Sequence, residues 1–395
     1  MSSHIGIGFS KDPDIIKAAQ QAAMEIKTKL GENPIGFVLF LTTVHYPSEQ
    51  TLPIIQNILN PPKIIGSSTA GIILSKTVET QGIAILAISS DEIHFGVSST
   101  NKITNENILQ EGKQLALDSL SDLGPHSRQT FLCFIDGNIQ DNSLFLKGLQ
   151  ETFGNLFPII GAGSSDDFQF MNTFQIFQKK ILTSAATGVI FGGQTSLGIG
   201  GGHGWRPLGK PRRVTESQGN IIKKINNKKA ALLYEEYFED EAKHFYSQKL
   251  NQTTILYPLG VFNPGSNSYL LRNAVDILED GSIVCQGNVP KNSEVHIMLG
   301  NKDACKQAAI QAAKEAKKNF SGKKIKLILI FESMTRLKLL GRTAKQEIFQ
   351  IKEIFEENIP IFGMYSYGEI YPFETSGKIK RPHLQNESII VIAIG

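Results

Sequence analysis

The chain has 395 residues, with 40 Lys and Arg against 37 Asp and Glu and a formal net charge of +3 at pH 7. This length suits two or three domains of about 150 residues, and so weak a charge excludes the basic surface that nucleic-acid binding requires. Three dispersed cysteines with no C-x-x-C pair exclude a disulfide framework and a thiolate metal site, and they indicate a reducing compartment. Because no signal peptide or membrane-length apolar run is present, we expect a cytoplasmic protein without membrane insertion.

A unit of about 95 residues recurs along the chain. Its first helix is visible as AAQQAAME at 18–25 and AAIQAAKE at 308–315, which share six of eight residues. Apolar runs that suit strands buried on both faces follow at 35–42, 130–137 and 325–332. Short strands in which a proline precedes a glycine come next, as PKIIGSSTAG (62–71), PIIGAGSSDD (158–167) and PIFGMYSYGE (360–369). Each copy closes with a returning strand, at 82–89, 187–193 and 388–395.

This alternation of helices and apolar strands predicts an α/β fold. We expect repeated βαβ units that form largely parallel or mixed sheets, in two related halves. The block near 200–295 departs from the repeat and predicts an α+β insert. It contains a helical pattern over 225–238 and a hairpin signal at Asp280-Gly281. The predicted domains are 1–199 and 200–395.

The three glycine turns supply the candidate ligand-binding residues, because ligands of open α/β sheets bind beyond the carboxyl ends of the strands. Hydroxyl and acidic side chains gather there, namely Ser67, Ser68, Thr69, Ser164, Ser165, Asp166, Tyr367 and Glu369. Arg272 and Arg336 can each clamp a carboxylate through two N–H bonds, which suits an amino-acid-like ligand. The alternative that the glycines only close turns, and that the arginines pair with neighbouring acids, stays open.

Motifs for catalysis are scarce. The chain has no phosphate loop, nucleophile elbow or zinc-binding histidine spacing, so we expect no metal site. An enzyme acting on a small polar substrate through Glu369 or Asp166 is an alternative to a non-enzymatic binder. His203, beside Trp205, is either a haem ligand, an acid/base group or a solvated loop histidine. Cys133 reads as a core residue.

The N-terminal pattern IGIGFS, followed by IIGSSTAG and GAGSSDD, resembles the FIST N-terminal domain, and GWRPLGKPRRVTES, YPLGV and IFGMYSYGEI resemble the FIST C-terminal domain. The resemblance implies an intracellular sensory protein of signal transduction that binds a small ligand, with amino acids as a proposed class. Haem-based sensing of nitric oxide in one branch is the alternative, and otherwise no cofactor is expected. In many members the arginine that corresponds to Arg336 ends a C-x-x-R motif. This chain lacks the cysteine and has Glu332 and Ser333 there instead.

The resemblance also implies a partner. Members are often fused to or paired with a histidine kinase, a cyclic-dinucleotide enzyme or a chemoreceptor. Because the FIST pair fills this sequence, we expect its signal to pass to a separate protein of one of these kinds.

Overall fold

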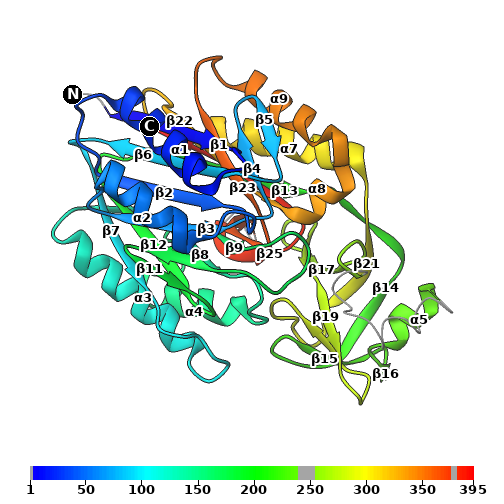
Figure 1. Ribbon diagram of the computed structural model, residues 1–395. Helices are drawn as coiled ribbons and strands as arrows, with labels where there is room; N and C mark the ends of the chain where they lie inside the picture. The colour runs from blue at the N-terminus through cyan, green and yellow to red at the C-terminus, as the bar shows by residue number, and fades with distance from the viewer. Residues whose placement is uncertain (1–2, 239–253, 375–379) are drawn as a thin grey trace.

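Three similar α/β units follow one another along the chain, and an α+β block interrupts the third (Figure 1). This computed structural model describes residues 3–238, 254–374 and 380–395. The first unit contains β1 (His4–Ser10), α1 (Ile15–Leu30), β2 (Phe37–Thr42), α2 (Ser48–Leu59), β3 (Ile64–Ser68), β4 (Gly71–Leu74), β5 (Thr77–Glu79) and β6 (Ile83–Ser89). The second contains β7 (Ile93–Ser99), α3 (Ile108–Leu123), β8 (Arg128–Asp136), α4 (Asn142–Phe153), β9 (Ile159–Ser164), β10 (Gln175–Phe177), β11 (Lys180–Leu182) and β12 (Ala186–Gly193).

The third unit begins with a strand that sequence reasoning did not assign to a repeat. Its elements are β13 (Leu197–His203), α7 (Lys302–Asn319), β22 (Leu327–Ser333), α8 (Met334–Leu340), η2 (Gly341–Thr343), α9 (Ala344–Ile354), β23 (Ile361–Ser366), β24 (Glu369–Glu374), β25 (Lys380–Gln385) and β26 (Ser388–Ile394). The α+β block lies between β13 and α7. The predicted domain boundary at 199/200 therefore falls inside β13.

Each unit builds the same mixed sheet around its buried middle strand. The middle strands β2, β8 and β22 pair in parallel with β3, β9 and β23. On their other side they pair antiparallel with the returning strands β6, β12 and β26, which in turn pair with the edge strands β1, β7 and β13. The predicted α/β class with repeated units is confirmed, and its sheets are mixed rather than largely parallel.

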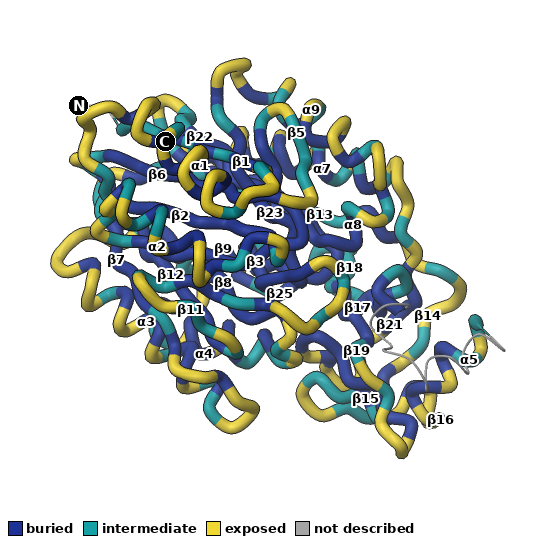
Figure 2. The backbone as a smooth tube through the Cα atoms, viewed as in Figure 1, coloured by how far each residue is buried: buried dark blue, intermediate teal, exposed yellow. Residues whose placement is uncertain are grey.

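The hairpin that follows each glycine turn leaves its own unit and completes the sheet of another. β4 of the first unit pairs with β23 of the third, β10 of the second pairs with β3 of the first, and β24 of the third pairs with β9 of the second. This closed exchange brings the three sheets around one apolar core, to which the middle strands contribute Leu39, Phe134 and Phe331. Figure 2 shows these strands as the buried centre of the molecule.

Small residues set the distance between the outer helices and the edge strands. A Cβ at Gly8 would lie 1.9 Å from the backbone oxygen of Ala22, and one at Gly200 would lie 2.1 Å from that of Ala312. Gly8 of β1 and the alternating glycines of β13 therefore face alanines of α1 and α7. This close packing accounts for the repeated AAQQAAME and AAIQAAKE segments.

The α+β block extends away from the three sheets (Figure 1). It contains β14 (Trp205–Gln218), β15 (Ile221–Ile225), β16 (Lys228–Lys229), α5 (Leu232–Phe238), β17 (Leu259–Asn263), β18 (Ser268–Arg272), β19 (Ala274–Ile277), β20 (Ile283–Cys285) and β21 (Glu294–Gly300). The hairpin predicted at Asp280-Gly281 is confirmed between β19 and β20. The helix predicted over 225–238 is wrong in its first half, because Asn226 and Asn227, with φ of 50° and 62°, turn β15 back into β16.

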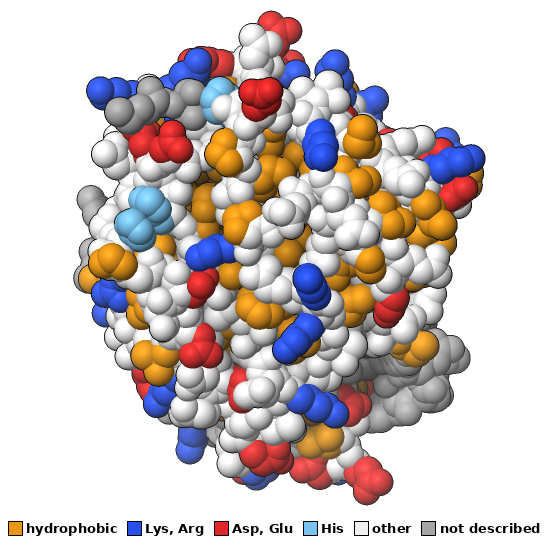
Figure 3. Space-filling model, turned by 60° about the vertical axis from the view of Figure 1, so that its left-hand side comes forward, with side chains coloured by type: hydrophobic (Ala, Val, Ile, Leu, Met, Phe, Trp, Pro, Cys, Tyr) orange, Lys and Arg blue, Asp and Glu red, His pale blue; other side chains and the backbone are white. Residues whose placement is uncertain are grey.

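The surface agrees with the near-neutral composition. On the face shown in Figure 3, apolar side chains gather in the middle, and Lys and Arg are scattered among Asp and Glu rather than collected in one basic area. Among the described residues, no helix is both long enough and apolar enough to cross a membrane.

The close approach of β13 to α7 makes a testable prediction. Gly200→Ala should lower the free energy of unfolding by about 1–3 kcal/mol, because the new methyl group meets a backbone oxygen that cannot move without shifting α7. Gly202→Ala, on the same strand, is the control: its Cβ would lie 3.6 Å from the nearest atom, in Ala308. Urea unfolding measures both, and equal losses would contradict the packing argument.

Candidate functional site

The three glycine turns meet where the units join, and hydrogen bonds of their hydroxyls link one turn to another. Ser67 Oγ lies 2.7 Å from Ser164 Oγ, and Ser165 Oγ donates to the carbonyl of Tyr365 over 2.6 Å. Thr69 Oγ1 reaches the same carbonyl over 2.9 Å, and Ser68 accepts the backbone N–H of residue 174 over 3.0 Å. All five hydroxyl side chains are buried. The structure thus brings the predicted residues together, with their hydrogen bonds made to one another or to nearby backbone groups; ligand contact by them stays a prediction.

Asp166 organises the loop that follows the second turn. Its carboxylate accepts the four successive backbone N–H groups of residues 169–172 over 2.8–2.9 Å, and it also accepts the hydroxyl of Tyr367. Burial alone would raise the pKa of Asp166, but these hydrogen bonds outweigh burial and hold the pKa below its usual value. The contacts of Asp166 are those of a loop-fixing anion.

Arg336 pairs with acids of its own unit. Its Nε donates to Glu332 over 3.0 Å, and its Nη2 donates to Glu347 and, over 3.1 Å, to the carbonyl of Cys305. Burial raises the pKa of both glutamates, while the Arg336 charge opposes that rise. These contacts match the alternative in which Arg336 pairs with neighbouring acids of the protein. A ligand carboxylate would have to displace these glutamates from Arg336.

Glu369 is a fully buried acid close to this ion pair. Ser366 donates to its Oε1 over 2.6 Å, and the backbone N–H and hydroxyl of Ser388 donate to its Oε2 over 3.1 and 2.7 Å. Burial raises the pKa of Glu369 to about 8, against the effect of these hydrogen bonds. Burial likewise raises the pKa of neighbouring Glu387 to about 7. These acids therefore bind protons near neutral pH.

Arg272 holds together three segments that are distant in sequence. On β18, its Nε donates to the carbonyl of Asn288 over 3.0 Å, and its Nη1 donates to those of Leu271 and Leu384 over 2.8 and 3.0 Å. The side chain is 4% exposed. Burial lowers the pKa of Arg272 to about 10, so the guanidinium still carries its charge at pH 7.

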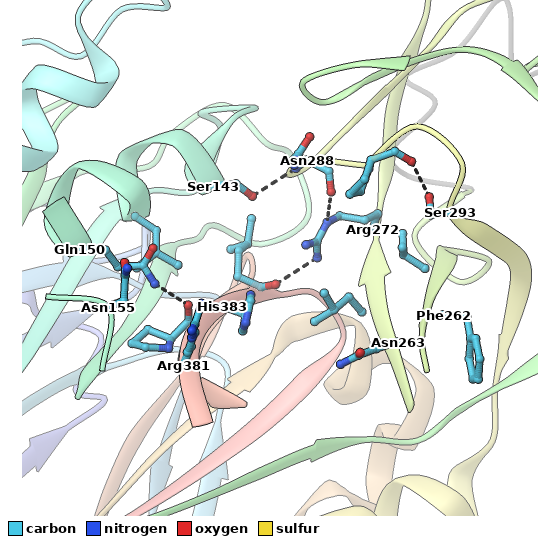
Figure 4. Close-up of a pocket in the computed structure, with 16 residues that line it drawn as sticks. Ser143, Gln150, Asn155, Phe262, Asn263, Arg272, Asn288, Ser293, Arg381 and His383 are labelled. Atoms are coloured by element: carbon cyan, nitrogen blue, oxygen red, sulfur yellow. Dashed lines mark hydrogen bonds between the residues drawn. The ribbon is translucent and has the colours of Figure 1, made fainter. Parts of the chain in front are cut away.

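Arg272 also lines a pocket of about 420 Å³ between α4, the α+β block and β25, which we call the Arg272 pocket (Figure 4). Two further basic side chains, Arg381 and His383, enter it from β25. Burial lowers the pKa of His383 to about 4, and the two arginines lower it further in the same direction. Apolar and amide side chains complete the walls: Leu146, Val261, Phe262, Leu270, Leu384, Gln150, Asn155 and Asn263.

The Arg272 pocket suits an anion. Within the described residues, no carboxylate lies at ion-pair distance from Arg272 or Arg381, and no acidic side chain lines the pocket. His383 is neutral at pH 7, and its buried Nε2 has no hydrogen-bond partner there. Sequence reasoning found Arg272 but missed Arg381 and His383, because the Arg-Pro-His run reaches Arg272 only through tertiary contacts.

The remaining candidates lie elsewhere. Cys133 is confirmed as a core residue, fully buried in β8, where burial raises its pKa to about 12. His203 ends β13, and its Nδ1 accepts the backbone N–H of Trp205 over 3.2 Å. Burial, followed by the charge of Arg336, lowers the pKa of His203 to about 4. Haem ligation by His203 stays a prediction. In the described part of the chain, no three His, Cys, Asp or Glu side chains are placed to hold a metal ion.

Family models match the chain over most of its length. The FIST N domain matches residues 36–228, and the FIST C domain matches residues 230–372. The chain belongs to the FIST family. FIST domains are sensory domains that bind small ligands.

The individual proteins that this chain matches are distant from it. An uncharacterized protein of Methanocaldococcus jannaschii is 23% identical over 304 residues, which are 72% of this chain and 57% of that protein. The chain thus spans little more than half of this curated relative. Cyanuric acid hydrolase from A. caulinodans aligns with 7% identity, a TM-score of 0.37 and coverage of 100% and 99% of the two chains. T. maritima PurL aligns with 8% identity, a TM-score of 0.23 and coverage of 100% and 72%. At such TM-scores the structural likenesses support no inference.

The raised pKa of Glu369 makes stability depend on pH. Since the folded state holds a proton that the unfolded state releases above about 4.5, this acid should destabilise the fold progressively as pH rises from 4.5 to 8. Glu369→Gln should remove that contribution. The melting temperature of the variant minus that of the wild type should therefore increase as pH rises from 5 to 8.5. Glu353→Gln, an exposed change on α9, is the control. Parallel pH profiles for wild type and Glu369→Gln would contradict this prediction.

Proposed function

We propose that this FIST protein senses a small carboxylate ligand, of the amino-acid type, in the Arg272 pocket. The observation that carries the proposal is a buried arginine with no carboxylate at ion-pair distance among the described residues; Asp141 acts on it only through its more distant charge. This arginine faces a pocket whose walls offer two more basic side chains, amides and apolar groups. A bidentate bond from Arg381 to a carboxylate, with Arg272 supplying positive charge behind it, supports this ligand class. Amide oxygens of Gln150 and Asn155 are available to an ammonium group, whereas that of Asn263 already accepts the backbone N–H of Gly265.

Signalling requires that the ligand prefer one conformation over another. The location of the Arg272 pocket supports this role, because α4 belongs to the second unit, β18 to the α+β block and β25 to the third unit. A ligand that bridges these segments stabilises their present arrangement. We propose that a separate signalling protein, such as a histidine kinase, a cyclic-dinucleotide enzyme or a chemoreceptor, distinguishes the ligand-bound conformation from the ligand-free one.

A cytoplasmic location is supported by three cysteines that are all buried and free.

The test is a thermal-shift and calorimetric screen of amino acids and small dicarboxylates. A ligand at 100 times its dissociation constant should stabilise the protein by about 2.7 kcal/mol. Arg381→Ala should weaken that ligand about tenfold or more, because it removes a charge-assisted bond from an exposed residue without disturbing the core. Arg342→Ala, an exposed arginine outside the pocket, should leave the affinity unchanged. The proposal fails if no compound stabilises the wild type, or if Arg381→Ala binds equally well.

A further inference from the structure

A second pocket lies where all three units meet, and of the acids that close the GAGSSDD turn it contains Asp167. It has a volume of about 530 Å³, and we call it the seam pocket. Its lining comes from the first unit (His45, Ala70, Thr80), the second (Asp167, Phe168) and the third (Met334, Leu337, Lys338). Ala70 belongs to the first glycine turn, and Asp167 and Phe168 follow the second. The seam pocket therefore lies beside the interlocked turns.

The wall formed by Phe168 is built from strained backbone. Phe168 has φ of 74° and Phe170 has φ of 55°, in the left-handed region that bulky side chains rarely adopt. The hydrogen bonds to Asp166 hold this conformation, and Tyr367 supports it: its hydroxyl accepts the N–H of Phe168 over 3.2 Å, and its ring stacks on Phe170 at 4.3 Å between centroids. Strain maintained by several independent contacts is characteristic of ligand-clamping segments.

The charges around the seam pocket indicate what it would hold. Phe168, Met334, Leu337 and Ala70 provide an apolar surface. The ammonium of Lys338 lies 4.2 Å from the centroid of the Phe168 ring, and it makes no ion pair with a described residue. Exposed His45 is a second basic group, while exposed Asp167 repels additional negative charge. One carboxylate on an apolar body fits this combination.

We propose that the seam pocket is a second ligand site, for monocarboxylates with an aromatic or branched apolar body. The carboxylate pairs with Lys338, and the apolar body packs against Phe168, Met334 and Leu337. This site is separate from the Arg272 pocket and does not depend on the function proposed for it. Because its walls come from all three units, an occupant contacts the joint that holds the three sheets together.

Isothermal titration calorimetry with sodium 3-phenylpropionate tests the proposal. We expect saturable binding, with 2-phenylethylamine and acetate at least about tenfold weaker, since the first lacks the carboxylate and the second lacks the apolar body. Lys338→Gln should weaken binding about tenfold. The matched control is Lys345→Gln, because Lys345 is also exposed and lies 5.3 Å above an aromatic ring, that of Phe349, but outside the pocket.

A variant that should strengthen binding shows that the loss of affinity in Lys338→Gln is not a nonspecific effect of mutation. Asp167→Asn removes the repelling charge and should strengthen binding of 3-phenylpropionate, whereas Arg381→Ala should not affect it. The ligand should also slow amide hydrogen exchange at residues 168–172. Absence of saturation, or equal affinity in wild type and Lys338→Gln, overturns the seam-pocket proposal. Neither result bears on binding in the Arg272 pocket, which Arg381→Ala tests separately.

Discussion

The fold depends on one constraint: no unit can complete its own sheet. Each of β3, β9 and β23 would present an unpaired edge, and the strand that satisfies it comes from another unit. Exposed sheet edges leave hydrogen-bonding groups unpaired and invite wrong pairings. The cyclic exchange of hairpins satisfies these edges and at the same time closes the three sheets on one apolar core. The three units therefore stabilise one another rather than folding as independent domains.

The exchange also explains why polar side chains lie at the centre. Every hairpin leaves its unit through a glycine turn, so three turns with their backbone groups are buried together. Buried polar groups need hydrogen-bond partners, and Ser67, Ser164 and Ser165 supply them across the unit boundaries. Space for a ligand remains at the seams instead, where the Arg272 pocket and the seam pocket each join segments of different origin.

A common backbone carries different chemistry in each unit. The register of the three parallel pairs places Thr42, Ile135 and Glu332 at equivalent positions, two residues after the residue paired with the turn glycine. Only Glu332 is charged, and the buried Arg336 that pairs with it also donates to Glu347. Buried ion pairs are costly to desolvate and contribute little net stability. Their concentration in the third unit is thus a specialisation of that unit, not a requirement of the fold.

The sequence by itself determined the units, because periodic apolar strands, the Ala-rich helices and the glycine turns are local patterns set by burial and backbone geometry. It also determined the FIST relationship and proposed Arg272 as a candidate binding residue. Tertiary structure alone decided where the hairpins pair, since β4 and β23 belong to opposite ends of the chain. Tertiary pairing also makes β13 a strand of the third unit, although the α+β block separates it in sequence from the rest of that unit. The same tertiary contacts bring Arg381 and His383 to Arg272. These outcomes depend on contacts between residues far apart in sequence, which no local pattern encodes.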